Sequence, residues 1–258
     1  IKLDAIESLI RPNTVAIIVN HASNVCGTIQ PIKEIGIICK DHHLHFIVDA
    51  AQTAGIIPID VKESQIDALC FTGHKGLLGP QGIGGMILTK EMAQSLTPLI
   101  AGGTGSFSHL ETMPTNMPDA FESGTLNLPG IIGLNEGLTF IESKGMENIH
   151  NHELALTEAF LKGLRPIDGI NIIGKQDVQD RTAVVSITID GADAASVAYE
   201  LESTYHIMTR VGLHCAPRAH QTLGTYPEGT VRFSFGYANT MEDIETALSA
   251  LTTIANKI

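Results

Sequence analysis

The chain has 258 residues, of which 43% are apolar and 17% charged, and this length is enough for one large or two modest domains with a sizeable core. Its 16 basic and 28 acidic residues give a net charge of −12, which leaves no basic face for nucleic acid or for an anionic membrane surface. No apolar run reaches the roughly 18 residues of a membrane helix, and the amino terminus lacks the pattern of a signal peptide. The four cysteines lack CxxC spacing and indicate reduced thiols. We therefore expect a soluble, cytoplasmic, globular protein that holds no metal.

Short apolar runs alternate with helical patterns in the first half of the chain. The β-branched run 14–19 predicts a strand buried on both faces, and Pro31 begins a helix with apolar residues at helical spacing. Further short strands are predicted at 45–48, 68–71 and 85–88, with glycine-rich connections between the last two. This alternation of strands and helices predicts a mostly parallel sheet in an α/β fold.

The second half begins with a looser segment. Residues 90–128 lack regular periodicity, and long irregular segments of this kind are usually functional. Pro129 begins a helical stretch that runs to about residue 164 with an interruption near Gly145. Beyond it we predict strands at 183–189 and 231–235, a helix at 192–205, and a final helix that Thr240 and Asp243 cap. We expect one domain over residues 1–135 and a second, including the linking helix, over residues 136–258.

A lysine and several glycines follow the predicted strand 68–71. Thr72, His74 and the neighbouring backbone N–H groups are suited to cradle a phosphate, as glycine-rich turns do. Lys75, if held at a buried positive site, can lose its proton and form a Schiff base with an aldehyde cofactor. A surface loop with an ordinary lysine is the alternative. The segment is not a Walker loop, because neither Lys-Ser nor Lys-Thr follows its glycines.

A carboxylate ends the preceding predicted strand. Asp49 follows the apolar run 45–48, and a buried carboxylate needs a partner. A protonated pyridine nitrogen is such a partner, and the pairing makes the ring an electron sink. Capping of the next segment is the alternative role for Asp49. Because residues 21–24 follow the strand before it, three strand ends place polar groups at one edge, where ligands bind in open α/β sheets.

Taken together, these blocks resemble the class V aminotransferase family of fold-type I enzymes that use pyridoxal 5′-phosphate (PLP), and they are most similar to its cysteine desulfurase branch of the SufS/Csd type. The matching blocks occur in order over nearly the whole chain: His21-Ala22-Ser23-Asn24, Asp49-Ala50-Ala51-Gln52, Thr72-Gly73-His74-Lys75, Glu122-Ser123-Gly124-Thr125, Arg210-Val211-Gly212-Leu213-His214-Cys215 and Val231-Arg232-Phe233-Ser234. The resemblance implies a PLP-binding large domain with a mostly parallel sheet and a smaller carboxyl-terminal α/β domain.

The resemblance also implies a role for each matched residue. Lys75 would bind the cofactor covalently, Asp49 would pair with its pyridine nitrogen, and Arg232 would bind the substrate carboxylate. The other implied cofactor contacts are Asn24 and Gln52 near the phenolic oxygen, Thr72 and His74 at the phosphate, and Thr125 at the phosphate of a neighbouring subunit. A homodimer is therefore implied.

Cys215 follows an Arg-x-Gly pattern, at the position of the family's persulfide cysteine. Arg210, Arg218 and His220 lie near it in the sequence, and basic neighbours favour the nucleophilic thiolate. A small buried hydrophobic side chain is the alternative role. A metal site made of His214, Cys215 and His220 lacks a second ligand pair.

The implied reaction converts L-cysteine to L-alanine. L-Cysteine displaces Lys75 from PLP, Lys75 moves a proton from Cα, and the Cys215 thiolate takes the sulfur as a persulfide, which then passes to an acceptor protein or thiol. The alternatives are another class V reaction (selenocysteine lyase or aminotransferase) and an inactive chain that serves only as a binding partner. The ring-stacking histidine of relatives has no match, and the first residue is not Met. We therefore expect this chain to be about two-thirds of an enzyme, to bind PLP weakly and to turn over slowly by itself.

Overall fold

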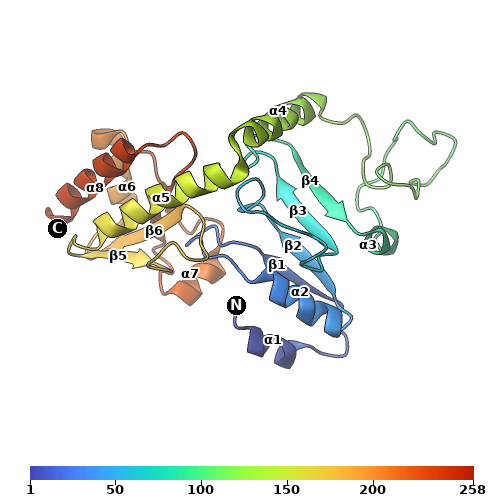
Figure 1. Ribbon diagram of the computed structural model, residues 1–258, viewed down its shortest axis with the longest axis horizontal. Coiled ribbons are helices and arrows are strands. Elements are labelled where there is room, and N and C mark those ends of the chain that lie inside the picture. Colours follow the sequence, from blue (N-terminus) through green and yellow to red (C-terminus); the bar gives the residue numbers. More distant parts are fainter. The chain divides into compact units, whose positions relative to one another are not determined.

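The computed structural model describes all 258 residues, which divide into two units (Figure 1). Unit 1 comprises residues 1–21 and 31–144, and unit 2 comprises residues 22–30 and 145–258. The chain therefore leaves unit 1 after its first strand, contributes a short hairpin to unit 2 and returns. None of the helices is both long enough and apolar enough to cross a membrane.

Unit 1 is built on a four-stranded sheet with the order β1-β2-β3-β4. Its elements are α1 (Leu3–Leu9), β1 (Ala16–Asn20), α2 (Ile32–Asp41), β2 (His45–Asp49), β3 (Ala68–Thr72), β4 (Gly84–Leu88), α3 (Lys90–Ser95) and α4 (Leu128–Lys144). Strands β1, β2 and β3 are parallel, and β4 is antiparallel to β3, to which a short connection joins it. The predicted α/β class with a mostly parallel sheet is confirmed.

The core of unit 1 lies between α2 and the sheet. Ile35 and Cys39 on α2 pack with Phe46 and Val48 on β2, because residues of alternate strand positions and of successive helical turns share one face. The prediction that the first strand is buried on both faces is wrong. Ile17 and Val19 face this core, so the alternating side chain of Ile18 lies on the opposite face of the sheet, where it is 70% exposed.

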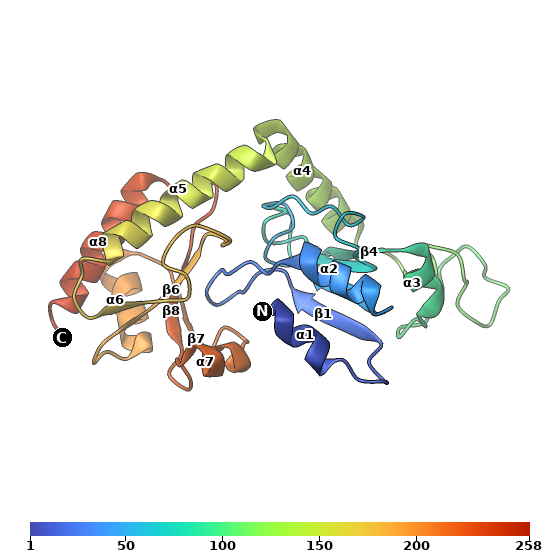
Figure 2. The ribbon, with the colours of Figure 1, turned by 60° about the horizontal axis from the view of Figure 1, so that its bottom comes forward.

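Unit 2 is built on an antiparallel sheet with the order β5-β6-β8-β7. Its elements are α5 (Met146–Leu164), β5 (Ile170–Ile173), β6 (Val184–Ile189), α6 (Ala194–Tyr205), β7 (Arg210–Gly212), α7 (Pro217–Leu223), β8 (Thr230–Ser234) and α8 (Met241–Ala255). Figure 2 shows α5, α6 and α8 gathered beside these strands. The predicted strands and helices of this part are confirmed, whereas the short elements β5, β7 and α7 were not predicted.

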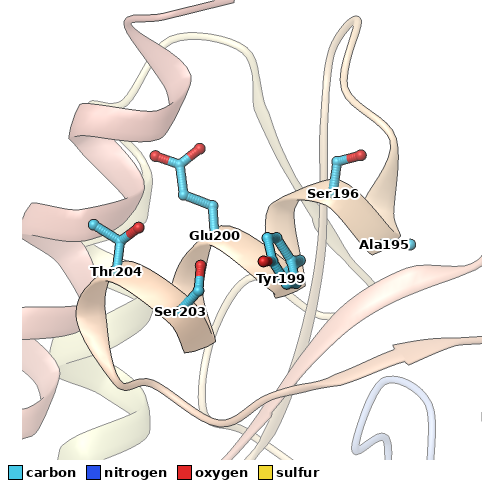
Figure 3. Close-up of a pocket in the computed structure, with 6 residues that line it drawn as sticks. All are labelled: Ala195, Ser196, Tyr199, Glu200, Ser203 and Thr204. Carbon is cyan, nitrogen blue, oxygen red and sulfur yellow. The ribbon is translucent and has the colours of Figure 1, made fainter.

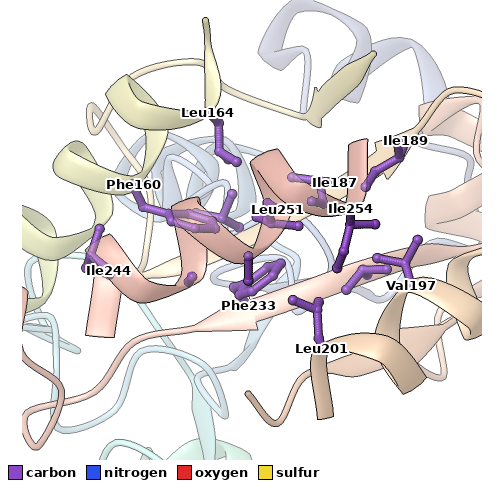
Figure 4. Close-up of a cluster of buried hydrophobic side chains, with 14 of the residues drawn as sticks. Phe160, Leu164, Ile187, Ile189, Val197, Leu201, Phe233, Ile244, Leu251 and Ile254 are labelled. Carbon is purple, nitrogen blue, oxygen red and sulfur yellow. The ribbon is translucent and has the colours of Figure 1, made fainter. Parts of the chain in front are cut away.

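The two faces of this sheet differ because strand side chains alternate between them. One face carries Phe233 and Ile187, which pack with Phe160 and Leu251 of the covering helices (Figure 4). The rings of Phe160 and Phe233 lie 4.9 Å apart. The other face carries Ser186 and Arg232, which are paired in register, and contacts the hairpin 22–30.

Helix ends follow the predicted signals. Gly145, at φ 82°, separates α4 from α5, in a backbone conformation that glycine adopts without steric cost. Thr240 and Asp243 form the capping box of α8: the Thr240 hydroxyl accepts from the Asp243 N–H, and the Asp243 carboxylate accepts from the Thr240 N–H.

Candidate active site

Asp49 lies at the carboxyl end of β2, in register with Asn20 of β1 and Cys70 of β3. Its Oδ1 accepts a hydrogen bond from the Ala51 N–H at 2.9 Å, so the carboxylate does cap the turn that follows. No cation pairs with it within unit 1. A carboxylate has about four lone-pair sites, so Asp49 retains the capacity to accept from a protonated ring nitrogen.

Lys75 lies in the turn after β3, where its side chain is exposed and its ammonium group has no hydrogen bond or ion pair within unit 1. The backbone of this turn touches the turn that follows Asp49. A Cβ added to Gly76 would lie 2.6 Å from the Ala54 carbonyl oxygen, and one added to Gly55 would lie 2.4 Å from the Gly76 carbonyl oxygen. Only glycine permits this approach, which brings the turn of Lys75 beside the turn of Gln52.

The suggested phosphate ligands lie on the same edge. Thr72 Oγ1 and His74 Nδ1 are 2.7 Å apart in a hydrogen bond, and the His74 side chain is exposed. An amine, a carboxylate, a hydroxyl and an imidazole thus gather on adjoining turns, and this set of groups fits the aldehyde, the pyridine nitrogen and the phosphate of PLP. Thr125 is exposed in a segment without regular structure, and no contact joins it to the other predicted residues.

The remaining predicted residues gather in unit 2. The Asn24 side chain, on the hairpin 22–30, donates from Nδ2 to the His214 carbonyl oxygen at 2.7 Å. Arg232 donates from a terminal guanidinium nitrogen to the Asn24 carbonyl oxygen at 2.9 Å. One hydrogen-bonded chain therefore connects Arg232, Asn24 and the residue before Cys215.

Cys215 is exposed, which contradicts the alternative of a small buried side chain. It lies in the loop between β7 and α7, and both His214 and Cys215 have left-handed backbone conformations, with φ of 49° and 61°. Such conformations are unfavourable for residues other than glycine and persist only where their surroundings hold them. The Asn24 bond to His214 is one such restraint, and the bond between the His214 ring and Thr230 Oγ1, at 2.9 Å, is another.

Positive charge surrounds this loop. Arg210 and Arg232 are opposite each other on β7 and β8. Burial, and then the charge of Arg210, lower the pKa of Arg232, while Cys215 acts in the opposite direction. Burial, and then Arg232 and His220, lower the pKa of His214 to about 4, so its ring is neutral at pH 7. The cations therefore favour an anion at this place.

Three supporting residues were not assigned a role from the sequence. His21 donates its backbone N–H to the Asp49 carbonyl oxygen, and its Nδ1 bonds to Thr53 Oγ1, each at 2.9 Å. The Thr230 hydroxyl is hydrogen-bonded to the His214 ring, and the Arg181 guanidinium donates to the Cys26 carbonyl oxygen in the hairpin 22–30. Their partners lie far away along the chain, so no spacing pattern reveals them.

The buried His21 gives a testable dependence on pH. Burial lowers the pKa of His21 from 6.5 to about 4. Between these two values His21 is protonated in the unfolded chain and neutral in the folded chain. The free energy of unfolding should therefore fall as the pH falls from 7, with a contribution from His21 of about 2 kcal/mol at pH 5. Urea unfolding at pH 7 and pH 5 should show a smaller decline in His21→Asn. The exposed control His206→Asn should decline as the wild type does, and an equal decline in all three would contradict the assignment.

A hollow of about 490 Å³ runs along α6 (Figure 3). Its lining residues all belong to that helix: Ala195, Ser196, Tyr199, Glu200, Ser203 and Thr204. None of the predicted cofactor or substrate residues is among them, so this hollow is not part of the candidate active site.

Comparisons with known proteins find relatives over nearly the whole chain. Residues 1–247 match the family model described as Aminotransferase class-V. The chain is 36% identical over 253 residues to a probable cysteine desulfurase of Methanothermobacter thermautotrophicus, which covers 97% of this chain and 63% of that protein.

Solved structures show the same fold. The apo structure of a cysteine desulfurase from Thermococcus onnurineus NA1 matches with a TM-score of 0.87 and 34% identity, over 94% of this chain and 60% of that one. A cysteine desulfurase of Escherichia coli, in an S-sulfonic acid form, matches with a TM-score of 0.89 and 26% identity, over 100% of this chain and 63% of that one. The chain thus spans less than two thirds of the length of these relatives.

Proposed function

The chain belongs to the class V aminotransferase family, and from this membership we propose that it acts as a PLP-dependent cysteine desulfurase that converts L-cysteine to L-alanine. The observation that carries the proposal is the position of Cys215. Its thiol is exposed on a loop that is held in an unfavourable backbone conformation beside two arginines. Such a loop suits a thiolate nucleophile.

Unit 1 is proposed to hold the cofactor. Lys75 provides the amine for covalent attachment, Asp49 accepts from the pyridine nitrogen, and Thr72 and His74 bind the phosphate. Gln52 contacts the phenolic oxygen. The family resemblance implies the same contact for Asn24, which belongs to the hairpin 22–30 of unit 2. When bound, PLP withdraws electrons from the α carbon of the amino acid.

The protein groups then carry out proton and sulfur transfer. The Lys75 amine accepts the proton from Cα and returns it to carbon. The Cys215 thiolate attacks the substrate sulfur: an S–S bond forms, the Cβ–S bond breaks, and its electron pair stays on Cβ, which is protonated to give alanine. Arg232 binds the substrate carboxylate, because a guanidinium is suited to bind a carboxylate through two hydrogen bonds.

The partners are proposals of the same kind. The persulfide sulfur passes to an acceptor protein or thiol. A homodimer would let Thr125 reach the phosphate in the neighbouring subunit, and the exposed apolar residues Leu128 and Ile132 at the start of α4 suit a subunit contact. All four cysteines are free, in keeping with the reducing cytoplasm.

A product assay tests the function. The PLP-loaded protein, given L-cysteine and a reducing thiol, should release alanine and sulfide in equal amounts. An aminotransferase would instead form a 2-oxo acid and would need an acceptor, and a selenocysteine lyase would form alanine from L-selenocysteine alone. Failure to form alanine from L-cysteine at saturating PLP would contradict the proposal.

A further inference from the structure

Arg181 is the largest fully buried side chain of the chain, with 1% of its surface exposed. Its guanidinium forms no ion pair with a carboxylate. Burial lowers its pKa, whereas Cys26 and the charge of Asp177 act in the opposite direction. It donates instead to backbone carbonyl oxygens, those of Lys175 (2.6 Å), Val184 (2.7 Å), Asp177 (3.4 Å), Cys26 (3.4 Å) and Thr182 (3.5 Å). Burying a charge is costly unless its hydrogen bonds are satisfied, so these hydrogen bonds offset the cost of removing the guanidinium from water.

Four of the five carbonyl partners of Arg181 lie within six residues of it in the sequence, and Cys26 lies 155 residues away. They come from the loop after β5, from the start of β6, and from Cys26 in the hairpin 22–30. The planar guanidinium presents five N–H donors in a fixed arrangement, and a lysine ammonium presents only three around one point. Lysine is therefore a poor replacement here even though it keeps the charge.

The hairpin lies tightly on unit 2 around this arginine. The Thr182 N–H donates to the Gly27 carbonyl oxygen at 2.8 Å, and Ser186 Oγ donates to the Val25 carbonyl oxygen at 2.5 Å. Gly27 has a φ of 73°, and a Cβ at this residue would lie 2.8 Å from the Val184 carbonyl oxygen. The hairpin can therefore lie in this position only with glycine at residue 27.

Two residues before Cys26, the same hairpin carries Asn24. The Asn24 side chain donates a hydrogen bond to the His214 carbonyl oxygen, and the Asn24 carbonyl oxygen accepts one from Arg232. We propose that Arg181 is a positioning residue, which anchors the hairpin 22–30 on the sheet of unit 2 and thereby fixes Asn24, Arg232 and the loop of Cys215. Only the catalytic consequence of this inference rests on the proposed function.

Alkylation of buried cysteines tests the anchor without any assay of activity. Cys26 lies in the hairpin and is 6% exposed, and Cys39 lies in the core of unit 1 and is 1% exposed. In Arg181→Lys, iodoacetamide under native conditions should modify Cys26 about tenfold faster or more, because the buried carbonyl groups lose part of their hydrogen bonding. Cys39 should stay protected. Peptide mass spectrometry measures both rates.

The matched control is Arg165→Lys, because Arg165 is exposed and donates to a single carbonyl oxygen, that of Gln176. It should leave the Cys26 rate unchanged. A protected Cys26 in Arg181→Lys would overturn the proposal. So would exposure of Cys26 together with rapid hydrogen exchange of the β6 and β8 amides, because Arg181 would then support the whole unit rather than the hairpin.

The kinetics of the PLP-loaded enzyme test the catalytic consequence. Arg181→Lys should raise KM for L-cysteine by about tenfold, through the misplaced Arg232, and should lower kcat less. A role confined to overall stability would lower the amount of active enzyme and leave KM unchanged, and that result would overturn the link to the site. If the wild-type enzyme forms no alanine, the proposed function is wrong. The alkylation result still decides whether Arg181 anchors the hairpin 22–30.

Discussion

Replacing Lys75 with alanine should abolish the absorbance band near the edge of the visible range that the protein develops when PLP is added. Lys75 supplies the amine among the groups that gather at the ends of β2 and β3, whereas Asp49, Thr72 and His74 offer only non-covalent contacts. Covalent attachment to the aldehyde therefore requires this side chain. A titration with PLP measures the band, and borohydride reduction followed by peptide mass spectrometry locates the attachment.

The matched control is Lys40→Ala, which removes an exposed lysine from the last turn of α2. It should leave the band and the PLP titration unchanged. A band of wild-type size in Lys75→Ala, or attachment of PLP to several exposed lysines in the wild type, would refute the assignment of Lys75.

Replacing Cys215 with alanine should lower the rate of alanine formation from L-cysteine by a factor on the order of 10³ or more, because no nucleophile then remains to take the sulfur. The absorbance band should persist, since Cys215 is not among the residues proposed to bind the cofactor. Coupled measurement of alanine and sulfide gives the rate, and the spectrum shows that the cofactor stays bound.

Cys39→Ala is the control for loss of a thiol, because Cys39 is buried in the core of unit 1. It should retain the rate of alanine formation. If Cys215→Ala retained a rate within about tenfold of the wild type, Cys215 would not be the sulfur acceptor, and a class V reaction that needs no thiol would account better for the site.

Local patterns predicted most of the regular elements. Parallel strands appeared as short apolar runs. Gly145 and the capping pair Thr240 and Asp243 marked helix ends through chemistry within a few residues. The edge formed by Asp49 and Lys75 followed from the rule that parallel strands end at one side of a sheet. Each of these features depends on short stretches of sequence.

Features that depend on distant contacts were not predictable in this way. Nothing in residues 22–30 indicates that they pack with the sheet of unit 2, because their partners lie some 150 residues or more along the chain. The buried Arg181 and the exposed Ile18 follow from the same cause, since burial is decided by which segments meet and not by residue type. The left-handed backbone at His214 and Cys215 likewise needs its distant partners, Asn24 and Thr230.

The most direct test of the proposed desulfurase reaction is the mass of the peptide that contains Cys215. The peptide is analysed after the PLP-loaded protein has reacted briefly with L-cysteine, without a reducing thiol. We predict one additional sulfur atom on Cys215, released by dithiothreitol, and none on Cys26, Cys39 or Cys70. Alanine formed in the same sample while Cys215 carried no added sulfur would contradict the assignment of Cys215 as the residue that accepts sulfur from the substrate.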